Sequence, residues 1–344
     1  MNTPLLEVKD LQTYFFSKHE TVKAVDGVSF TVNEQETFGL VGESGCGKSM
    51  TCRSILGLVK SPGRVVGGEI LYKGDDLLHK SKREMQAIRG REIGMIFQEP
   101  MTALNPLLKV KDQIIDALDK SIYNTAEKRY NHALEMLKLV GIPSPESRLE
   151  EYPHQFSGGM RQRVMIAIAL CSGLKLLLAD EPTTALDVTI QDQVMKLINR
   201  LRDQLKMSVI LITHDLGVVA QMCDRVAVMY AGQIVEMTDT RTLFHMPRHP
   251  YTYALMSSLP GAAGSSQKRL PTIEGAPPNL ANLPEGCPFA PRCRFAQDIC
   301  RKEKPELLPY EGDVAHLVRC HIRDGRTQFV GATAKGKQEG GAEQ

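Results

Sequence analysis

A glycine-rich octapeptide constrains this chain more than any other feature. Residues 42–49 read Gly-Glu-Ser-Gly-Cys-Gly-Lys-Ser, which matches the pattern G-x-x-x-x-G-K-S. The apolar run 37–41 precedes it and the helix-compatible run 50–58 follows, so it joins a buried strand to a helix. Glycines let backbone N–H groups converge on phosphate oxygens, and the helix adds its positive N-terminal end. The pattern predicts a phosphate-binding loop made by Gly42, Ser44, Gly45, Cys46, Gly47, Lys48, Ser49 and Met50.

Four polar side chains have expected roles at such a loop. Lys48 is expected to reach the β- and γ-phosphates of a nucleotide, and the Ser49 hydroxyl to bind Mg²⁺. The apolar run 176–179 ends in Asp180 and Glu181. We expect Asp180 to hold the Mg²⁺ shell and Glu181 to accept a proton from the attacking water. Acidic residues after a strand often only cap the next helix. Asp180 and Glu181 therefore indicate a nucleotide site mainly because the same chain contains the phosphate loop.

Residues 5–245 alternate short β-rich runs with helical stretches, which predicts an α/β fold with a largely parallel sheet. Together with the phosphate-loop pattern at residues 42–49, this predicts a fold of the P-loop NTPase type. The helical stretches 110–120 and 126–140 lie between two of the predicted core strands, and the second ends at Gly141. This order predicts a helical subdomain inserted into the sheet domain at about 100–172. The predicted buried strands are 37–41, 93–97, 176–179 and 209–213.

The composition changes after residue 245. Of the 19 prolines in the chain, 11 lie between Pro247 and Pro309, and no long periodic segment survives among them. Such a region has little core of its own and needs a cross-link, such as a bound metal or cluster, to be stable. We therefore expect a small extension over 246–330 that is held together by such a cross-link. Residues 331–344 offer almost nothing to bury and predict a disordered tail.

The charge balance and the absence of long apolar runs exclude several classes of protein. The chain carries 42 Lys and Arg against 40 Asp and Glu, a net charge of +2, so it has no broad field for holding nucleic acid. No stretch approaches the roughly 18 apolar residues of a membrane span. The first residues show no basic region followed by an apolar one, as a secretory signal would. These observations predict a cytosolic chain that does not bind nucleic acid.

The eight cysteines fall into two groups. Cys46, Cys52, Cys171 and Cys223 lie in apolar or glycine-rich segments, as small buried side chains do. The other four have the spacing C-x₅-C-x₆-C-x₁₉-C, and without secretion they favour a metal site over disulfides. Four thiolates suit either Zn²⁺ or an iron–sulfur cluster, and the spacing does not choose between them. The predicted ligands are Cys287, Cys293, Cys300 and Cys320.

Residues 156–163, Phe-Ser-Gly-Gly-Met-Arg-Gln-Arg, resemble the signature motif of ATP-binding cassette (ABC) proteins. The family commonly has Leu first and Gln fifth, where this chain has Phe156 and Met160, but the core of Ser157, Gly158 and Gly159 is intact. The resemblance implies an ABC-type sheet domain that uses ATP and Mg²⁺. It also implies that the phosphate loop of one subunit faces the Ser-Gly-Gly segment of another, so one chain makes half of each site.

The same resemblance assigns further residues. Phe15 is similar to the aromatic residue that stacks on adenine, with Tyr14 and Phe16 as adjacent alternatives. Gln98 resembles the glutamine that senses Mg²⁺ and the attacking water, and the loop 185–187 resembles the one that crosses the dimer. The resemblance therefore places Asp187 in the loop that crosses the dimer. It also makes His214 the switch histidine, so that the predicted catalytic set is Glu181, His214 and Gln98.

Four segments resemble the dipeptide and oligopeptide importer branch of the family. They are 98–106, 152–155, 180–187 and 249–252. The chain has neither a second cassette nor a fused membrane domain, so the resemblance implies a separate ATPase subunit on the cytoplasmic face of the membrane. Its implied partners are a sister ATPase subunit, in a heterodimer or a homodimer, two membrane permeases bearing on the 98–106 loop, and an extracytoplasmic solute-binding protein.

The resemblance to this branch also has implications for the ligand of the four cysteines and for the alternative functions of the chain. In some of its members these cysteines hold a four-iron four-sulfur cluster, which favours that group over Zn²⁺ here. Import of nickel or another small solute is an alternative, because that branch shares these motifs. A second alternative is a cluster-dependent redox or nucleic-acid-binding regulatory module, which the near-neutral charge disfavours.

Overall fold

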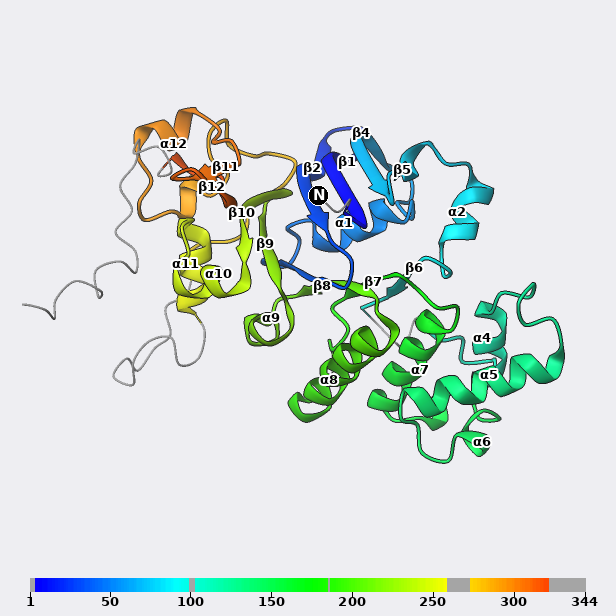
Figure 1. Cartoon of the computed structure of the whole chain (residues 1–344). Coiled ribbons are helices and arrows are strands. Elements are labelled where there is room, and N and C mark those ends of the chain that lie inside the picture. The colour runs from blue at the N-terminus through cyan, green and yellow to red at the C-terminus, as the bar shows by residue number, and fades with distance from the viewer. Residues whose placement is uncertain (1–3, 99–102, 185, 259–272, 322–344) are drawn as a thin grey trace, which may run out of the picture.

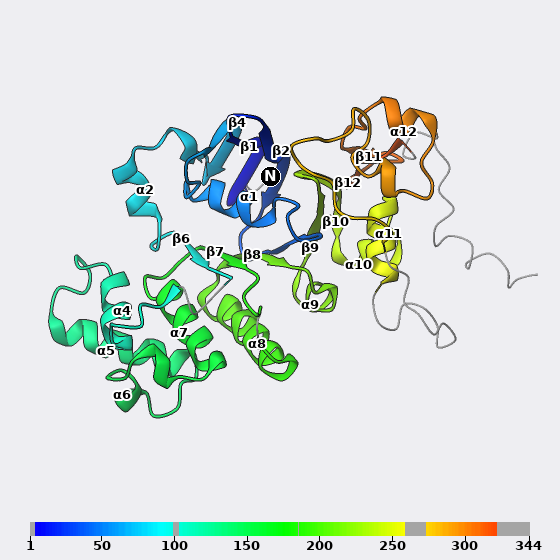
Figure 2. The same cartoon turned by 180° about the vertical axis from the view of Figure 1, so that it is seen from behind.

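The computed structural model describes residues 4–98, 103–184, 186–258 and 273–321. Its elements form two sheets with helices between and beside them (Figure 1). Seen from behind, the helical part around α5 and the segment around α12 lie at opposite ends of the larger sheet (Figure 2). The predicted tail 331–344 lies outside the described residues.

The larger sheet carries the core of the molecule. Its eight strands have the order β11-β12-β10-β9-β3-β8-β7-β6, and the run from β9 to β6 is parallel. Strands buried on both faces need nearly continuous apolar sequence, which these segments have, and the predicted α/β fold is thus confirmed. The parallel strands are β3 (Thr37–Val41), β6 (Ile93–Ile96), β7 (Leu176–Asp180), β8 (Ser208–Thr213) and β9 (Arg225–Tyr230).

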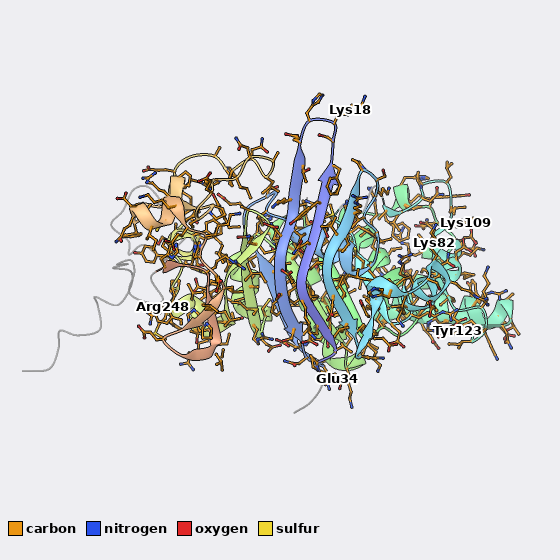
Figure 3. The ribbon with its side chains drawn as sticks, turned by 90° about the horizontal axis from the view of Figure 1, so that it is seen from above. Lys18, Glu34, Lys82, Lys109, Tyr123 and Arg248 are labelled. Carbon is orange, nitrogen blue, oxygen red and sulfur yellow. The ribbon has the colours of Figure 1, made fainter. Side chains whose placement is uncertain are left out.

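The smaller sheet is antiparallel, with the order β2-β1-β4-β5. Figure 3 looks down on it, with Lys18 at one end of the β1–β2 hairpin and Glu34 at the other. Helix α1 (Lys48–Ile55) contacts β1, β2 and β7, and its Cys52 joins the same core cluster as Leu6 and Leu40. The phosphate-loop helix is therefore held by both sheets. The strands are β1 (Leu6–Phe16), β2 (Thr21–Val32), β4 (Gly63–Tyr72) and β5 (Asp75–Asp76), followed by η1 (Leu77–His79) and α2 (Lys82–Ile88).

Helices fill the chain between β6 and β7. Helix α7 packs on α4, α5 and β6, which ties this part to the sheet edge. Helix α5 ends before Gly141, whose φ of +74° is the left-handed conformation that favours glycine after a helix. The elements are α4 (Val110–Ala117), α5 (Ala126–Leu139), α6 (Pro145–Arg148), η2 (Pro153–Gln155) and α7 (Gly158–Leu170).

Helices α8 to α11 follow β7 in the described part of the chain. Helix α9 packs on β3 and β8, and α10 packs on β9 and β10. Within the described ranges, no helix combines the length and the apolar character needed to cross a membrane. These helices are α8 (Val188–Leu205), α9 (Leu216–Met222), α10 (Thr240–His245) and α11 (Pro250–Ser257).

The C-terminal extension joins the larger sheet, which the sequence did not predict. Strand β12 (Asp313–Val318) pairs with β10 (Gln233–Asp239) through Glu236↔Val318 and Met237↔Leu317, and β11 (Leu308–Tyr310) pairs with β12. Strands this short show too little alternation in sequence to be predicted, especially in a proline-rich region. Pairing with β10 is what attaches this part of the extension to the rest of the chain. The other elements are η3 (Ala290–Arg292) and α12 (Asp298–Lys302).

A buried carboxylate on β10 adds a polar tie to the extension. The side chains of Glu236 and His316 are 0% and 4% exposed, and His316 Nε2 lies 2.7 Å from Glu236 Oε1. The backbone N–H groups of Arg248 and His249 also donate to Glu236, at 2.7 and 2.9 Å. Because a buried carboxylate is tolerated only when its oxygens are hydrogen-bonded, this network fixes the chain just after α10 against the sheet.

Candidate nucleotide-binding site

The phosphate loop connects β3 to α1, as predicted. Gly47 is the N-cap residue of α1, with a φ of +107°. A Cβ on Gly42 would lie 2.2 Å from the Met229 carbonyl oxygen, so only glycine fits there. Around Gly45 nothing lies within 4 Å of such a Cβ, and Ser44 and Gly45 are exposed. The loop is closely packed where it leaves β3 and open at its tip.

Lys48 is held inside the loop by backbone carbonyls. Its Nζ donates to the carbonyl oxygens of Gly42 at 2.8 Å and Glu43 at 2.9 Å, and the residue is 5% exposed. A buried ammonium must keep its hydrogen bonds, so Lys48 can turn toward a phosphate only by exchanging these carbonyls for phosphate oxygens. The carbonyl groups of the loop thus hold the Lys48 ammonium close to where the phosphates would bind.

Ser49 and Asp180 meet although 131 residues separate them. The Ser49 hydroxyl donates to Asp180 Oδ1 at 2.7 Å, and Asp180 is 1% exposed at the end of β7. Burial raises the pKa of Asp180, while the Ser49 hydrogen bond partly opposes that shift. A hydroxyl and a carboxylate beside the phosphate loop are hard oxygen donors of the type Mg²⁺ prefers.

Glu181 is the centre of a second polar cluster. Its Oε2 accepts hydrogen bonds from Gln98 Nε2 and from the Thr184 hydroxyl, both at 2.9 Å. His214 Nδ1 lies 3.7 Å from Glu181 Oε1, beyond hydrogen-bond distance, and the His214 side chain is 68% exposed. The structure therefore brings together all three residues of the predicted catalytic set and adds Thr184, which the sequence analysis missed.

The backbone at Glu181 is itself unusual. Its φ is +46°, a left-handed conformation that costs a non-glycine residue about 1–3 kcal/mol. The Glu181 N–H donates to the Ile212 carbonyl at 2.9 Å, at the end of the neighbouring strand β8. This turn directs the carboxylate away from β7 and toward Gln98 and His214.

Ser157, Gly158 and Gly159 begin helix α7. Ser157 is the N-cap residue, and its hydroxyl accepts from the Met160 N–H at 3.3 Å. A Cβ on Gly159 would lie 2.7 Å from Ile190 Cγ2, so packing against α8 within the same chain already requires glycine there. Ser157 and Gly158 are exposed and remain free to face a partner.

Two predicted residues at the edges of the site have structural roles in this chain. Asp187 caps α8, with Oδ1 accepting from the Ile190 N–H at 2.9 Å, and its neighbour Ala185 lies outside the described residues. Phe15 packs over Gly63, where an added Cβ would lie 2.5 Å from its ring. Phe15 as the adenine-stacking residue and Asp187 as a dimer-loop residue remain predictions.

The four extension cysteines gather round one small cavity of about 20 Å³, which His249 and Phe289 also line. Cys300 and Cys320 are buried, and Cys287 donates its N–H to the Cys300 carbonyl at 2.8 Å. Within the described parts of the chain, however, no group of three or more His, Cys, Asp or Glu side chains is arranged to hold a metal ion. The expected zinc- or cluster-stapled extension is therefore not supported by the side-chain geometry. The other four cysteines are buried thiols, as predicted.

One set of contacts at the phosphate loop had no signal in the sequence. Arg292, in the extension, forms an ion pair with Glu43 of the loop at 2.6 Å. The Glu43 N–H donates to the Tyr251 hydroxyl at 2.9 Å. Position x of the phosphate-loop pattern accepts any residue, and 249 residues separate the ion-paired side chains, so neither spacing nor periodicity indicates this contact.

A strand, a phosphate loop and a helix define a P-loop site in this chain. Ser49 of that helix pairs with Asp180 at the end of β7, and the hydrogen-bonded Glu181 follows directly, which is the arrangement of a nucleotide-hydrolysing site. Residues 25–184 match the family described as ABC transporter, and residues 235–300 match the oligopeptide/dipeptide transporter C-terminal region. The chain belongs to the ABC transporter family, as an ATPase subunit with that C-terminal region. The family that residues 156–163 indicate is thus confirmed.

Curated relatives agree with this assignment over nearly the whole chain. The chain is 51% identical over 317 residues to the probable peptide ABC transporter ATP-binding protein y4tR of Sinorhizobium fredii, covering 92% of this chain and 94% of that protein. It is 51% identical over 307 residues to the oligopeptide transport ATP-binding protein OppD of Bacillus subtilis, covering 89% and 86%. The dipeptide transport ATP-binding protein DppD of Escherichia coli is 46% identical over 303 residues, covering 88% and 92%.

Solved structures match about 70% of the chain. The dimeric post-hydrolysis state of the ATP-binding cassette MJ0796 bound to ADP and Pi aligns with a TM-score of 0.61 at 28% identity, covering 69% of this chain and 99% of that one. The structure of cbiO1 from Clostridium perfringens, part of the ABC transporter complex cbiONQ, aligns with a TM-score of 0.60 at 25% identity, covering 71% and 92%. These alignments support the ABC-type P-loop fold.

Proposed function

We propose that the chain is the ATP-hydrolysing subunit of an importer for dipeptides or oligopeptides. The observation that carries this proposal is the joint occurrence of the Gln98–Glu181–His214 cluster with a C-terminal region that matches peptide transporters. Relatives at about half identity are named for peptide, oligopeptide or dipeptide transport. Import of nickel or another small solute, and a redox or nucleic-acid-binding module, lack comparable support.

Each residue of the site has a proposed role in hydrolysis. Lys48 leaves the carbonyls of Gly42 and Glu43 and neutralises charge on the β- and γ-phosphates. Ser49 and Asp180 are suited to hold Mg²⁺, which neutralises the developing phosphate charge when bound.

The Glu181 carboxylate accepts the proton of the attacking water, while Gln98 and Thr184 fix its orientation through their hydrogen bonds. The His214 side chain is exposed, so it is accessible for contact with the γ-phosphate. The remaining predicted roles are for Phe15 on the adenine and for Ser157, Gly158, Gly159 and Asp187 of a partner subunit across the nucleotide.

The assembly that we propose has several parts. The exposed Ser157 and Gly158 would face the phosphate loop of a sister ATPase subunit, so two ATPase subunits enclose each nucleotide. A heterodimer is our main proposal and a homodimer the alternative. The pair would lie on the cytoplasmic face of the membrane beneath two permease subunits, which receive solute from an extracytoplasmic solute-binding protein.

Reconstituted vesicles test the proposed substrate. We expect ATP hydrolysis by the complete complex to rise severalfold when the binding protein delivers dipeptides or oligopeptides, because closure of the ATPase pair would be coupled to solute delivery. Nickel complexes should leave the rate unchanged, and Glu181→Gln complexes should not respond to peptides. Stimulation by nickel but not by peptides would transfer the assignment to the alternative importer.

For the extension, we propose that Cys287, Cys293, Cys300 and Cys320 bind a four-iron four-sulfur cluster, with Zn²⁺ as the alternative. The convergence of four thiols on one cavity supports a shared ligand, although the loops must separate to admit one. Purification without oxygen should yield a chain with iron and sulfide in equal amounts, and Cys293→Ser should lose both. Cys171→Ser, at a buried thiol in the helical part, is the matched control. Zinc in place of iron would select the alternative. A purified chain that contains neither iron nor zinc would contradict the proposal.

A further inference from the structure

The extension is hydrogen-bonded to the phosphate loop at Glu43. Arg292 Nη1 donates to Glu43 Oε2 at 2.6 Å, and Arg292 Nη2 donates to Glu43 Oε1 at 3.0 Å. Two parallel N–H···O bonds make this a bidentate pair, which fixes direction as well as distance. The Arg292 side chain is 6% exposed and that of Glu43 is 25% exposed, so water screens the pair weakly.

Two further contacts hold the Arg292 guanidinium in place beside Glu43. Arg292 Nε donates to the Glu274 carbonyl at 3.0 Å, and Nη1 also lies 3.4 Å from the Tyr230 hydroxyl. The hydrogen bonds to Glu43 raise the pKa of Arg292 further above its ordinary value, so it stays charged. An arginine whose Nε and Nη1 groups already have other partners loses little freedom on binding a carboxylate. Arg292 is therefore a rigid anchor for the loop.

Tyr251 of α11 makes a second contact with Glu43. The Tyr251 hydroxyl accepts the Glu43 N–H at 2.9 Å, and the Tyr251 ring is fully buried. That ring packs on Tyr230 and Phe289, with centroid distances of 4.7 and 5.3 Å. Both the side chain and the backbone N–H of Glu43 are thus bound by residues outside the loop.

The third contact of Glu43 leads to the nucleotide site. Its carbonyl oxygen accepts from Lys48 Nζ at 2.9 Å, and Lys48 is the residue that meets the phosphates in the proposed function. Any displacement of Glu43 would therefore move a partner of Lys48. A chain of direct contacts runs from the extension, through Arg292 and Glu43, to Lys48.

We propose that Arg292 is a positioning residue for the phosphate loop, acting through Glu43, so that the C-terminal extension sets the affinity of the site for ATP. This inference rests on the proposed function, because it presupposes that the loop binds ATP. Arg292 reaches the site through Glu43, and it has no proposed role at the phosphates or in the chemistry at Glu181. Its loss should therefore weaken ATP binding and leave the rate at saturating ATP nearly unchanged.

The test is a double-mutant cycle on ATP affinity in the complete ATPase pair. Arg292→Gln and Glu43→Gln should each weaken equilibrium ATP binding by roughly 5- to 30-fold, the effect of losing one moderate interaction. The double variant should bind no more weakly than the worse single variant, because both changes break the same pair. The KM for ATP should rise in parallel while kcat stays close to that of the wild-type pair.

Arg294→Gln is the matched control, since it removes the same charge two residues along the same loop from an exposed side chain. It should bind ATP as the wild type does. If Arg292→Gln binds ATP as tightly as Arg294→Gln, or if the two changes at the pair are simply additive, the inference is wrong. Should Arg292→Gln fail to fold, Arg292→Lys and hydrogen exchange at the amides of residues 42–49 decide the question. Arg292→Lys should show faster exchange there with unchanged global stability, and unchanged exchange contradicts the inference.

The outcome also separates this inference from the proposed function. A wild-type pair that fails to bind ATP contradicts the proposed function itself. A wild-type pair that binds ATP, with variants that bind equally well, contradicts only the role of Arg292.

Discussion

Glu181→Gln should abolish most turnover while ATP binding survives. The change keeps the shape of the side chain, and the amide oxygen can still accept from Gln98 and Thr184, which lie 2.9 Å from the carboxylate. It removes the group that accepts a proton from water, a contribution typically worth about 10²–10⁴-fold in rate. We therefore expect phosphate release to fall by that factor, with the dissociation constant for ATP close to that of the wild type.

The control is Glu127→Gln, at an exposed position near the start of α5 and remote from the cluster. It should hydrolyse ATP at the wild-type rate. Single-turnover and binding measurements on both variants separate chemistry from affinity. Undiminished hydrolysis by the Glu181 variant would remove the assignment of Glu181 as the base, and parallel loss of ATP binding would indicate a structural defect.

Lys48→Met should mainly weaken nucleotide binding. The methionine keeps the unbranched apolar stem but loses the ammonium that now bonds to the Gly42 and Glu43 carbonyls. A hydrogen bond to a charged group is worth about 1.5–3 kcal/mol, so ATP affinity should fall by roughly 10- to 150-fold. Titration with a fluorescent ATP analogue measures this directly.

Lys60→Met is the matched control, because Lys60 is an exposed lysine shortly after α1. It should leave affinity unchanged. The Lys48 variant should also lose much of its salt-dependent binding, since the phosphates no longer meet a fixed cation. An affinity within twofold of wild type would show that Lys48 stays on the loop carbonyls and does not serve the phosphates.

The parts of the fold that could be predicted are those in which neighbouring residues determine the structure. Continuous apolar runs marked β3, β6, β7 and β8 to within a residue or so, because strands buried on both faces carry no polar positions. The phosphate loop is equally local, since its glycines, lysine and serine act within eight consecutive residues. Glycine after α5 marked the end of that helix for the same reason.

What escaped prediction depends on contacts between distant segments. Strands β11 and β12 span three and six residues, and their place beside β10 follows from pairing across about eighty residues. The same holds for the Arg292–Glu43 pair, in which nothing near either residue reveals its partner. Gly159 is a different case. The family resemblance places the Ser-Gly-Gly segment opposite the phosphate loop of another subunit, whereas contact with Ile190 in the same chain already excludes a side chain at this position.

Pairing of β12 with β10 restricts how this polypeptide can be shortened. Cutting the chain at residue 258, just after α11, would remove β12 and leave one border of β10 without its pairing strand, while the other border would stay paired with β9. An unprotected strand border of this kind promotes association with other copies. Fragments for crystallisation or display should therefore retain residues through Val318, and a shorter piece should be recovered mainly as aggregate.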